Sequence, residues 1–501
     1  MNKETSLDRS LKILVKSSLL VFVGIFISKI MLYLYRVIIA RHYGPETYGL
    51  FSLSVIILSL FAAFATLGLN EGILRYIPIF RSKKDLGKIS YLIKFSLRTV
   101  FFLSLVFSLV LFFSSNFISE FFFHNISLSI FLKISSFTIP LLVLSSVYLA
   151  SIRGFEKIGW YSFIVNILPN VTKFLAIVIF VYLGIKREYV MISYFLGILL
   201  MLLVSYYIYK TKISKSLGIS QVKLESRYKL KKHLFIYSMP IMFSSILGLV
   251  YYWIDSFAIG FLKGVTDVGI YNVVVPIALL LTIIPDLFIQ LFYPLITKEY
   301  HRKNYKLVKE ISKQVGKWIF ILTLPLFLII FIFPEAIINI LFGYQYIIAG
   351  TALRILVVGS LAALLSGLLF TLLFTVGKSK LAFINLLVTS ILNLILNLIL
   401  VPIYGINGAA ISTASVWIIL TSILLFQVRK FLGFIPMRRK FIRIVIVTIL
   451  PLAIMMVARS LVEINFITLS LIGILFLLSY LVTLLITGCF DRNDLMIISS
   501  F

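Results

Sequence analysis

Residues 40–53 read ARHYGPETYGLFSL, a short polar turn between two long apolar stretches. A helix that reaches this turn has to end in it, because Gly44 tolerates positive φ and Pro45 fixes φ while lacking an N–H. About 220 residues later, residues 263–276 read KGVTDVGIYNVVVP, where a polar turn again leads through a glycine into an aromatic residue and an apolar run. Two similar turns so far apart predict a long internal repeat.

The composition of the chain requires lipid as its solvent. Of 501 residues, 61% are hydrophobic and 13% are charged, and the mean hydropathy is +1.10. A water-soluble core cannot bury that much apolar surface. The single Cys489 excludes an intramolecular disulfide and a cysteine-built metal site. The basic stretch 1–16 runs into an apolar segment without a small-residue cleavage site, which indicates a first spanning helix rather than a signal peptide.

Apolar runs of about 20 residues or more, bounded by Gly, Pro, Asn or charge, predict fourteen spanning helices. We place them near 16–40, 48–78, 88–114, 128–151, 159–183, 189–210, 233–261, 269–297, 314–341, 346–375, 380–402, 406–428, 441–461 and 466–488.

The positions of the cations test this count. With fourteen crossings, 34 Lys and Arg residues fall on the side that holds the N-terminus, and five fall on the other side. Since cytoplasmic loops are enriched in Lys and Arg, we expect a multi-pass protein of a prokaryotic plasma membrane with both termini in the cytoplasm. The net charge of +29 then meets anionic membrane lipids, and we expect no nucleic-acid partner.

The repeat extends well beyond the two turns. Residues 132–134 align with 353–355 at an offset of 221, and Gly49 aligns with Gly269 at an offset of 220. Each copy holds six helices, an even number of crossings, so the copies are related by a pseudo-twofold axis along the membrane normal. We therefore predict an all-α integral membrane protein of about 14 transmembrane helices, organised as a six-helix lobe (1–210), a basic cytoplasmic linker (211–232), a second six-helix lobe (233–430) and two extra helices with a tail (431–501).

Three segments carry a resemblance to a known family. They are ARHYGPETYGLFSL, the following GLNEGILRYI at 68–77, and YYWIDSFAIGFLKGVTDVGIYNVVVP at 251–276. With the plan of six, six and two helices, the sequence resembles the polysaccharide flippases of the multidrug/oligosaccharidyl-lipid/polysaccharide exporter superfamily. The resemblance implies two lobes around a central cavity that move a lipid-linked saccharide between leaflets by alternating access. Other cell-surface polysaccharide assembly proteins are further expected partners.

Cations inside the predicted helices are candidates for the substrate site. A Lys or Arg near the bilayer centre costs about 2.5–3.5 kcal/mol on insertion scales, so such residues usually face protein or water and often mark function. Snorkelling accounts equally well for those near helix ends, such as Lys94 and Arg98. We expect a cationic cavity that binds the phosphate or pyrophosphate between saccharide and lipid, and its candidates are Lys29, Arg36, Lys133, Lys173 and Arg354.

Acidic residues within the helices are few, and their roles stay open. Arg75 follows Glu71 by four residues on one helix face, where an ion pair lowers the cost of both charges. Asp255 either couples transport to protons or sodium or pairs with a neighbouring cation in a structural role. A set of asparagines either binds sugar hydroxyls or bridges helices, namely Asn166, Asn170, Asn385, Asn393 and Asn397.

Two other functions compete with a flippase. A multidrug exporter of the same superfamily would rely on acidic cavity residues, whereas the helix charges here are mainly basic. A membrane glycosyltransferase or polymerase would need a sizeable outer loop with carboxylates, and the predicted outer loops are short. The sequence holds neither a phosphate-binding glycine loop nor a His-Glu-x-x-His motif, so we expect no catalytic residues, no metal site and no cofactor, and a protein that is not an enzyme.

Overall fold

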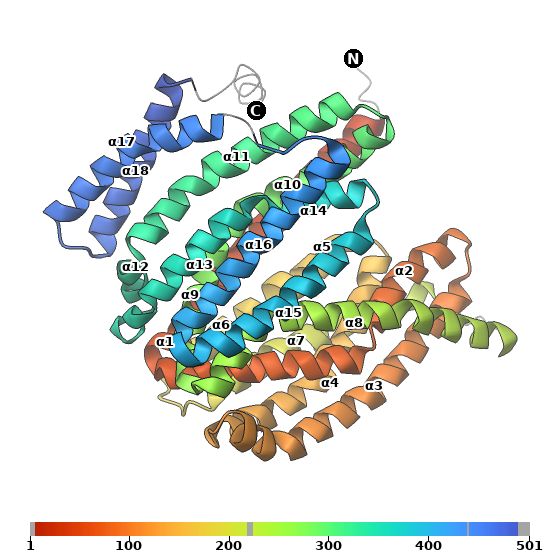
Figure 1. Ribbon diagram of the computed structural model, residues 1–501. Helices are drawn as coiled ribbons and strands as arrows, with labels where there is room; N and C mark the ends of the chain where they lie inside the picture. Colours follow the sequence, from red (N-terminus) through yellow and green to blue (C-terminus); the bar gives the residue numbers. More distant parts are fainter. Residues whose placement is uncertain (1–5, 218–223, 438–439, 489–501) are drawn as a thin grey trace. The chain divides into compact units, whose positions relative to one another are not determined.

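The computed structural model describes residues 6–217, 224–437 and 440–488, so Cys489, both chain ends and part of the predicted linker lie outside the described residues. Every regular element in these ranges is a helix (Figure 1). Thirteen helical spans there are long and apolar enough to cross a membrane. One of them, Ile27–Thr66, contains Gly44 and covers the first predicted helix from residue 27 onward and most of the second. The predicted all-α membrane architecture is confirmed.

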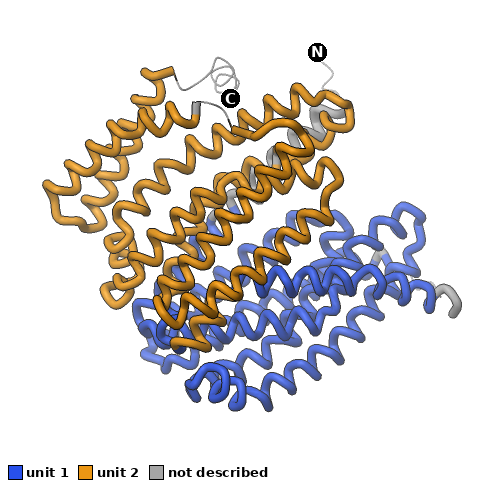
Figure 2. The backbone as a smooth tube through the Cα atoms, viewed as in Figure 1, with its two compact units in different colours: residues 1–253, 264–269 blue, residues 254–263, 270–501 orange. Residues whose placement is uncertain are grey.

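The chain divides into two compact units (Figure 2). The first consists of residues up to 253 together with 264–269, and the second consists of 254–263 and the residues from 270 onward. The predicted lobe boundaries at 210 and 233 follow the repeat rather than internal contacts, and they stay a prediction.

The helices of the first unit account for the predicted spans, with short breaks between some of them. They are α1 (Ser6–Thr66), α2 (Leu69–Ser82), α3 (Leu86–Phe117), α4 (Ser127–Gly154), α5 (Ile158–Ser162), α6 (Leu168–Tyr182), α7 (Tyr189–Lys212) and most of α8 (Leu224–Leu262). A π-helical turn, Phe163–Ile167, joins α5 to α6.

The opening turn divides α1 into two segments. Gly44 has non-helical dihedrals, φ 82° and ψ 177°, and the chain changes direction there (Figure 1). The rings of Tyr35 and Phe51 lie 5.7 Å apart edge to face, so the two segments pack against each other. The Pro-Gly chemistry of this turn is therefore what folds the first two predicted spans into a hairpin.

The two repeated turns meet within the first unit. A Cβ on Gly49 would lie 1.9 Å from the carbonyl oxygen of Val265, and a Cβ on Gly269 would lie 2.0 Å from that of Pro45. No real side chain fits at such distances, so both positions require glycine. The matching glycines of the two repeat copies thus let the turns approach backbone to backbone.

The second predicted span, 48–78, is two helices rather than one. The helix α1 ends at Thr66 and α2 begins at Leu69, with Gly68 between them at φ 65°. A Cβ on Gly68 would lie 2.4 Å from the carbonyl oxygen of Ser238 on α8. The break arises because α8 passes too close for a continuous, side-chain-bearing helix.

The second unit holds the end of α8, most of α9 and all later helices. Their bounds are α9 (Val265–Leu279), α10 (Ile283–His301), α11 (Tyr305–Ile332), α12 (Pro334–Phe342), α13 (Gly350–Ala362), α14 (Ser366–Thr375), α15 (Ser379–Tyr404), α16 (Ile406–Leu432), α17 (Lys440–Leu461) and α18 (Phe466–Ile486). Pro334 at the first turn of α12 suits its position, because its missing N–H has no helical partner there. Asn465 and Thr468 form a capping box at the start of α18.

The last two helices pack against α11. Ile444 of α17 and Leu484 of α18 are fully buried in a cluster with Ile321 of α11. The hydroxyl of Tyr480 donates to the carbonyl oxygen of Ile321 at 2.9 Å. Since apolar side chains gain little by leaving lipid for protein, such close packing and hydrogen bonds hold membrane helices together.

Candidate functional site

A partly buried cationic cluster lies in the first unit, on α1, α6 and α7. Lys173 of α6 is only 6% exposed, and its Nζ lies 4.0 Å from the ring centroid of Tyr194 on α7. The face of the ring attracts the ammonium electrostatically, which offsets part of the cost of burying it. We use the name cationic cluster for Arg36, Lys173 and the tyrosines Tyr35, Tyr48 and Tyr194.

A glycine on α7 makes room for the lysine. A Cβ on Gly197 would lie 2.6 Å from Cγ of Lys173 and 2.8 Å from the carbonyl oxygen of Pro169. Both distances are shorter than any real Cβ contact. The absence of a side chain at Gly197 therefore lets α6 and α7 approach each other with the lysine stem between them.

Arg36 of α1 brings a second positive charge to the cluster. Its guanidinium hydrogen-bonds with the side chain of Tyr48, and its charge repels that of Lys173. Arg36 is the charged residue that acts on Lys173, and no carboxylate of the described residues forms an ion pair with the lysine. Two cations that share a low-dielectric site without a carboxylate create a strong preference for an anion.

The hydroxyl of Tyr35 completes the polar side of this cluster. It lies 3.0 Å from Oγ of Ser193 and donates to the carbonyl oxygen of Val190 at 3.3 Å. These contacts tie α1 to α7 at the level of the cations. The tyrosine is 1% exposed, so its position is set by packing as well as by hydrogen bonds.

Two other predicted cations of the first unit lie apart from Lys173. Lys29 is exposed and precedes Arg36 by seven residues on α1, which places it on the same helix face roughly 10 Å away. Lys133 is half-buried on α4, and the backbone carbonyl of that residue accepts a hydrogen bond from Ser136. Of the four predicted cations in this unit, the structure brings Arg36 and Lys173 together.

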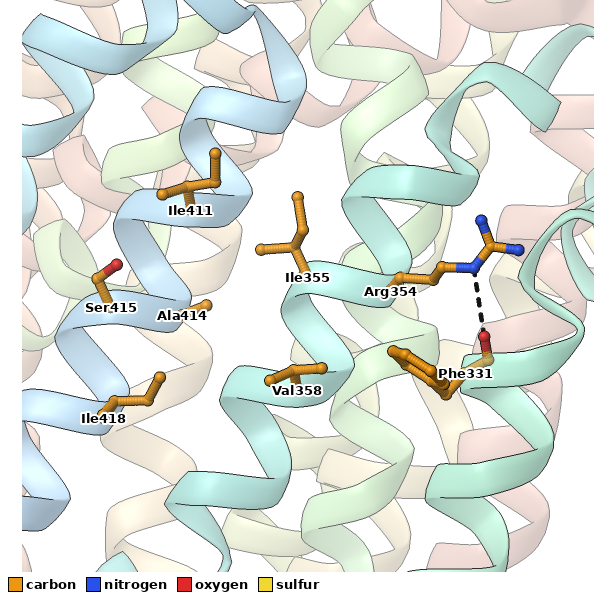
Figure 3. A pocket seen from close by; sticks show the side chains of 8 residues that line it. All are labelled: Phe331, Arg354, Ile355, Val358, Ile411, Ala414, Ser415 and Ile418. Atoms are coloured by element: carbon orange, nitrogen blue, oxygen red, sulfur yellow. Dashed lines mark hydrogen bonds between the residues drawn. The ribbon is translucent and has the colours of Figure 1, made fainter. Parts of the chain in front are cut away.

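Arg354 lies in the second unit and is already paired. Its Nη2 donates to Oε2 of Glu335 at 2.9 Å, and its Nε donates to the carbonyl oxygen of Phe331 at 3.3 Å (Figure 3). It borders an open hollow of about 300 Å³ whose other lining residues are mostly aliphatic. The hollow is lined by Phe331, Arg354, Ile355, Val358, Ile411, Ala414, Ser415 and Ile418.

A buried carboxylate organises a second polar cluster, in the second unit. Asp255 accepts hydrogen bonds from Tyr271 at 2.7 Å, Thr413 at 2.5 Å, Asn397 at 2.9 Å and Asn393 at 3.4 Å. The five side chains come from α8, α9, α15 and α16, and each is at most 9% exposed. We use the name carboxylate cluster for these five residues.

The carboxylate cluster offers oxygen atoms to a small cation. Besides the two oxygens of Asp255 it contains the hydroxyls of Tyr271 and Thr413 and the amide oxygens of Asn393 and Asn397. Oδ1 of Asn397 is buried and has no hydrogen-bond partner in the described chain. The described residues hold no group of three or more His, Cys, Asp or Glu suited to a metal ion. With one formal negative charge, this oxygen set suits a singly charged cation.

The two clusters occupy equivalent places in the repeat. At the offset of 220, Asp255 corresponds to Tyr35, Asn393 to Lys173, and Thr413 to Ser193. In both units the first residue of the set hydrogen-bonds with the third. The equivalent sets therefore carry opposite charges, but at different members of the set, since Lys173 corresponds to the neutral Asn393 and Asp255 to the neutral Tyr35.

Sequence reasoning found only part of these clusters. It selected Arg36, Lys173 and Asp255 because charges are rare in apolar helices, and it noted that asparagines either bind sugar or bridge helices. It missed the tyrosines and Thr413, whose types are common in membrane helices. The signal that could have found them is the repeat offset, applied to the neighbours of each charged residue.

The remaining predicted residues have contacts of other kinds. The guanidinium of Arg75 lies 4.1 Å from the ring centroid of Tyr237, and Glu71 accepts a hydrogen bond from Asn70 at 3.4 Å. The pairing of Glu71 with Arg75 stays a prediction. Nδ2 of Asn170 donates to Oγ of Ser28 on α1 at 2.8 Å, a bridge between helices.

Comparisons with known proteins give likenesses in sequence. The profile described as polysaccharide biosynthesis protein matches residues 14–299, and the profile described as MatE matches residues 240–399. An uncharacterized membrane protein of Methanocaldococcus jannaschii is 26% identical over 470 residues, 90% of this chain and 91% of that one. A putative O-antigen transporter of Shigella flexneri is 26% identical, covering 77% of this chain and 90% of its own. A probable low-salt glycan biosynthesis flippase of Haloferax volcanii is 26% identical over 39% of this chain and 42% of its own.

Solved structures give likenesses in fold. The chain is similar to a lipid II flippase, MurJ, in an inward closed conformation, with a TM-score of 0.73 and 18% identity over 95% of this chain and 100% of that one. It is also similar to a multidrug resistance transporter of the MATE family in an inward-facing conformation, with a TM-score of 0.67 and 16% identity over 80% of this chain and 94% of that one. With the thirteen apolar spans, these likenesses identify a multi-pass membrane protein of this fold.

Proposed function

The chain belongs to the polysaccharide biosynthesis protein family, and we propose that it flips lipid-linked saccharides between the leaflets of a membrane by alternating access. The names of the Shigella and Haloferax relatives, a putative O-antigen transporter and a probable glycan biosynthesis flippase, support this activity. The cation asymmetry along the sequence supports both termini in the cytoplasm. The relatives from Methanocaldococcus, Shigella and Haloferax support a prokaryotic plasma membrane. The activity is transport, without a chemical step on the saccharide.

The cationic cluster binds the anionic link between saccharide and lipid. The observation that carries this proposal is that the buried Lys173 and the half-buried Arg36 act on each other without an ion pair to a carboxylate among the described residues. The guanidinium fork of Arg36 suits two oxygens of one phosphate, while Lys173 acts as a compact point charge. Hydroxyls of Tyr48 and Tyr194 are placed to donate further hydrogen bonds. Lys29, Lys133 and Arg354 are proposed secondary contacts, and the Glu335 partner of Arg354 weakens its claim.

The carboxylate cluster couples transport to sodium. A proton would satisfy Asp255 but not the buried amide oxygen of Asn397, because an amide is not protonated at physiological pH. Sodium accepts carboxylate, hydroxyl and amide oxygens alike. Sodium would drive the transport cycle because it binds one conformation of the protein more tightly than the other.

A multidrug exporter remains the second candidate function. Its support is the MatE profile over residues 240–399 and the fold shared with a MATE transporter. Organic cations are common multidrug substrates, and the positive charges of the half-buried Arg36 and the buried Lys173 would repel them. The cationic cluster therefore favours an anionic substrate.

Complementation of a flippase-deficient strain tests the proposed function. Arg36→Ala and Lys173→Ala should each abolish complementation at normal protein levels, whereas Arg36→Lys should keep part of it because the charge remains. Lys94→Ala is the matched control, since Lys94 is an exposed helix cation on α3. Full complementation by both Ala variants would show that the cluster does not bind substrate.

A further inference from the structure

One face of α15 carries a polar residue at every turn. Asn385, Thr389, Asn393 and Asn397 follow one another at intervals of four, so they lie one above the other on the helix. All four are at most 7% exposed, whereas the rest of α15 is mostly aliphatic. We use the name polar ladder for these four residues and Gln427 of α16. Along the helix axis the ladder spans roughly 18 Å.

The ladder connects the carboxylate cluster with the opposite end of α15. At one end Nδ2 of Asn397 donates to Oδ1 of Asp255 at 2.9 Å. At the other end Asn385 and Gln427 form a reciprocal amide pair, with N–O distances of 2.7 and 3.0 Å. Gln427 is half-buried and lies two residues before Arg429, in the segment that the cation count assigns to the cytoplasmic side. The ladder thus leads from a partly exposed amide to a fully buried carboxylate.

Thr389 lies between the two ends and keeps acceptor capacity. Its hydroxyl donates to the backbone carbonyls of Asn385 and Leu386, so its oxygen lone pairs remain available. Consecutive rungs are about 6 Å apart along the axis. Oxygens at such intervals can replace the hydration shell of a small cation step by step, as the carbonyl rings of ion channels do.

Helix packing alone does not call for the ladder. In the repeat, α6 and α7 of the first unit correspond to α15 and α16 of the second. At the offset of 220, the four ladder positions of α15 correspond to Val165, Pro169, Lys173 and Ile177. Gln427 becomes Tyr207, so the amide pair has no counterpart. The first unit has polar side chains elsewhere on the equivalent helix, where Asn166 donates to Ser162 at 3.3 Å and Asn170 donates to Ser28 at 2.8 Å. At the positions that correspond to the ladder, however, it packs without a polar row. Buried amides are costly in a membrane. Among the described residues, the asparagines buried to 7% exposure or less belong to the second unit, which holds Asp255, whereas Asn166 and Asn170 of the first unit are half-buried.

We infer that the polar ladder is the route by which sodium passes between the cytoplasmic side and the carboxylate cluster. This inference rests on the proposed coupling of transport to sodium at Asp255. A route changes how fast the ion arrives and leaves, whereas the carboxylate cluster sets how tightly it is held. The two roles therefore separate in kinetics.

The test replaces the amide pair of Asn385 and Gln427, at the cytoplasmic end of the ladder. In the double variant Asn385→Leu/Gln427→Leu both partners become apolar together, which leaves no buried amide unpaired and protects the fold. Binding of radioactive sodium to purified protein in lipid nanodiscs is then followed over time. We expect an equilibrium affinity within about twofold of wild type, and association and dissociation rates that both fall by about tenfold or more.

A second interhelical pair serves as the matched control. Ser366 of α14 and Thr421 of α16 hydrogen-bond at 2.7 Å in the same unit but away from the ladder. The double variant Ser366→Ala/Thr421→Val should exchange sodium at the wild-type rate. Slowing by this control as well would mean that any loss of an interhelical bond slows exchange, which contradicts the route.

The outcomes separate the route from the coupling. Wild-type protein that binds sodium, and loses binding on Asp255→Asn, supports the coupling. If the Asn385→Leu/Gln427→Leu variant then exchanges sodium as fast as wild type, the amide pair is a structural clamp and the route is wrong. Reduced affinity with unchanged rate of association would equally contradict it. Wild-type protein that binds no sodium would overturn the coupling and the route together.

Discussion

The side chain of Lys173 shows how a cation is kept inside an apolar helix bundle. The ring of Tyr194 covers its ammonium, Gly197 leaves space for its stem, and Arg36 adds a second charge nearby. None of these groups supplies a negative counter-charge. The site therefore keeps its preference for an anion while the lysine itself stays well packed.

Gly197→Ala tests this arrangement at the scale of one residue. The new Cβ would overlap Cγ of Lys173 and the carbonyl oxygen of Pro169, so either the lysine or α6 has to move. We expect a loss of stability of about 1–3 kcal/mol, as for other overpacked sites. We also expect transport to fall more than it does in a variant that is equally destabilised at a position away from Lys173. Thermal unfolding and complementation measure the two effects.

Gly159→Ala is the control for this variant, because a Cβ there meets nothing within 4 Å. It should leave both stability and complementation near the wild-type values. Normal complementation by Gly197→Ala would show that the position of Lys173 does not matter for transport.

At the scale of elements, the two repeated turns act as one structure. Gly49 lies against the carbonyl of Val265, and Gly269 lies against the carbonyl of Pro45, so each turn supplies the surface that the other needs. The sequence predicted the turns and their glycines from Gly and Pro chemistry. It could not predict their mutual contact, because that depends on how distant helices pack.

Gly49→Ala and Gly269→Ala should each destabilise the protein. The added Cβ atoms would overlap backbone oxygens, which cannot swing aside as a side chain can, so we expect about 1–3 kcal/mol for each variant. The first alanine already separates the two turns, so the second alanine causes less further overlap. The double variant should therefore lose less stability than the sum of the losses of the two single variants. Thermal unfolding of wild type, the two single variants and the double variant gives a double-mutant cycle. Gly248→Ala is the control, because a Cβ at Gly248 meets no atom within 4 Å. Additive losses would show that the two contacts are independent.

The same limit explains which parts of the candidate site were predictable. Charges stand out in apolar helices because burying them is costly, so Arg36, Lys173 and Asp255 could be chosen from the sequence. Arg354 was chosen for the same reason, yet Glu335 compensates its charge in the structure. That contact joins the end of α11 and α12 to α13, and helical periodicity carries no information on it. The break at Gly68 likewise follows from a neighbouring helix, α8.

At the scale of the whole molecule, the repeat generates two units with opposite polar clusters. Equivalent positions carry Lys173 and Ser193 in one unit, and Asn393 and Thr413 in the other. A duplicated helix bundle can thus hold an anion at one copy of a position and a cation at the other. The proposed transport cycle uses the first for the substrate and the second for coupling.

The predicted topology is tested by labelling single cysteines in a chain that carries Cys489→Ser. Lys215 and Thr266 are both exposed, so Lys215→Cys and Thr266→Cys should react with a membrane-impermeant maleimide. The cation split predicts that position 215 reacts only from the cytoplasmic side and position 266 only from the outside. If both positions were labelled from the same side of the membrane, the fourteen-helix topology would be contradicted.

The central claim is that the cationic cluster recognises the anionic link of the substrate, and a binding comparison tests it most directly. Wild-type protein and the Arg36→Ala/Lys173→Ala variant are titrated in nanodiscs with a fluorescent polyprenyl diphosphate saccharide and with an uncharged ether-linked analogue. We predict that wild type prefers the diphosphate by about tenfold or more and that the variant has lost this preference, since each charge-assisted contact contributes on the order of 1.5–3 kcal/mol. A variant that still prefers the diphosphate as strongly as wild type would contradict the account.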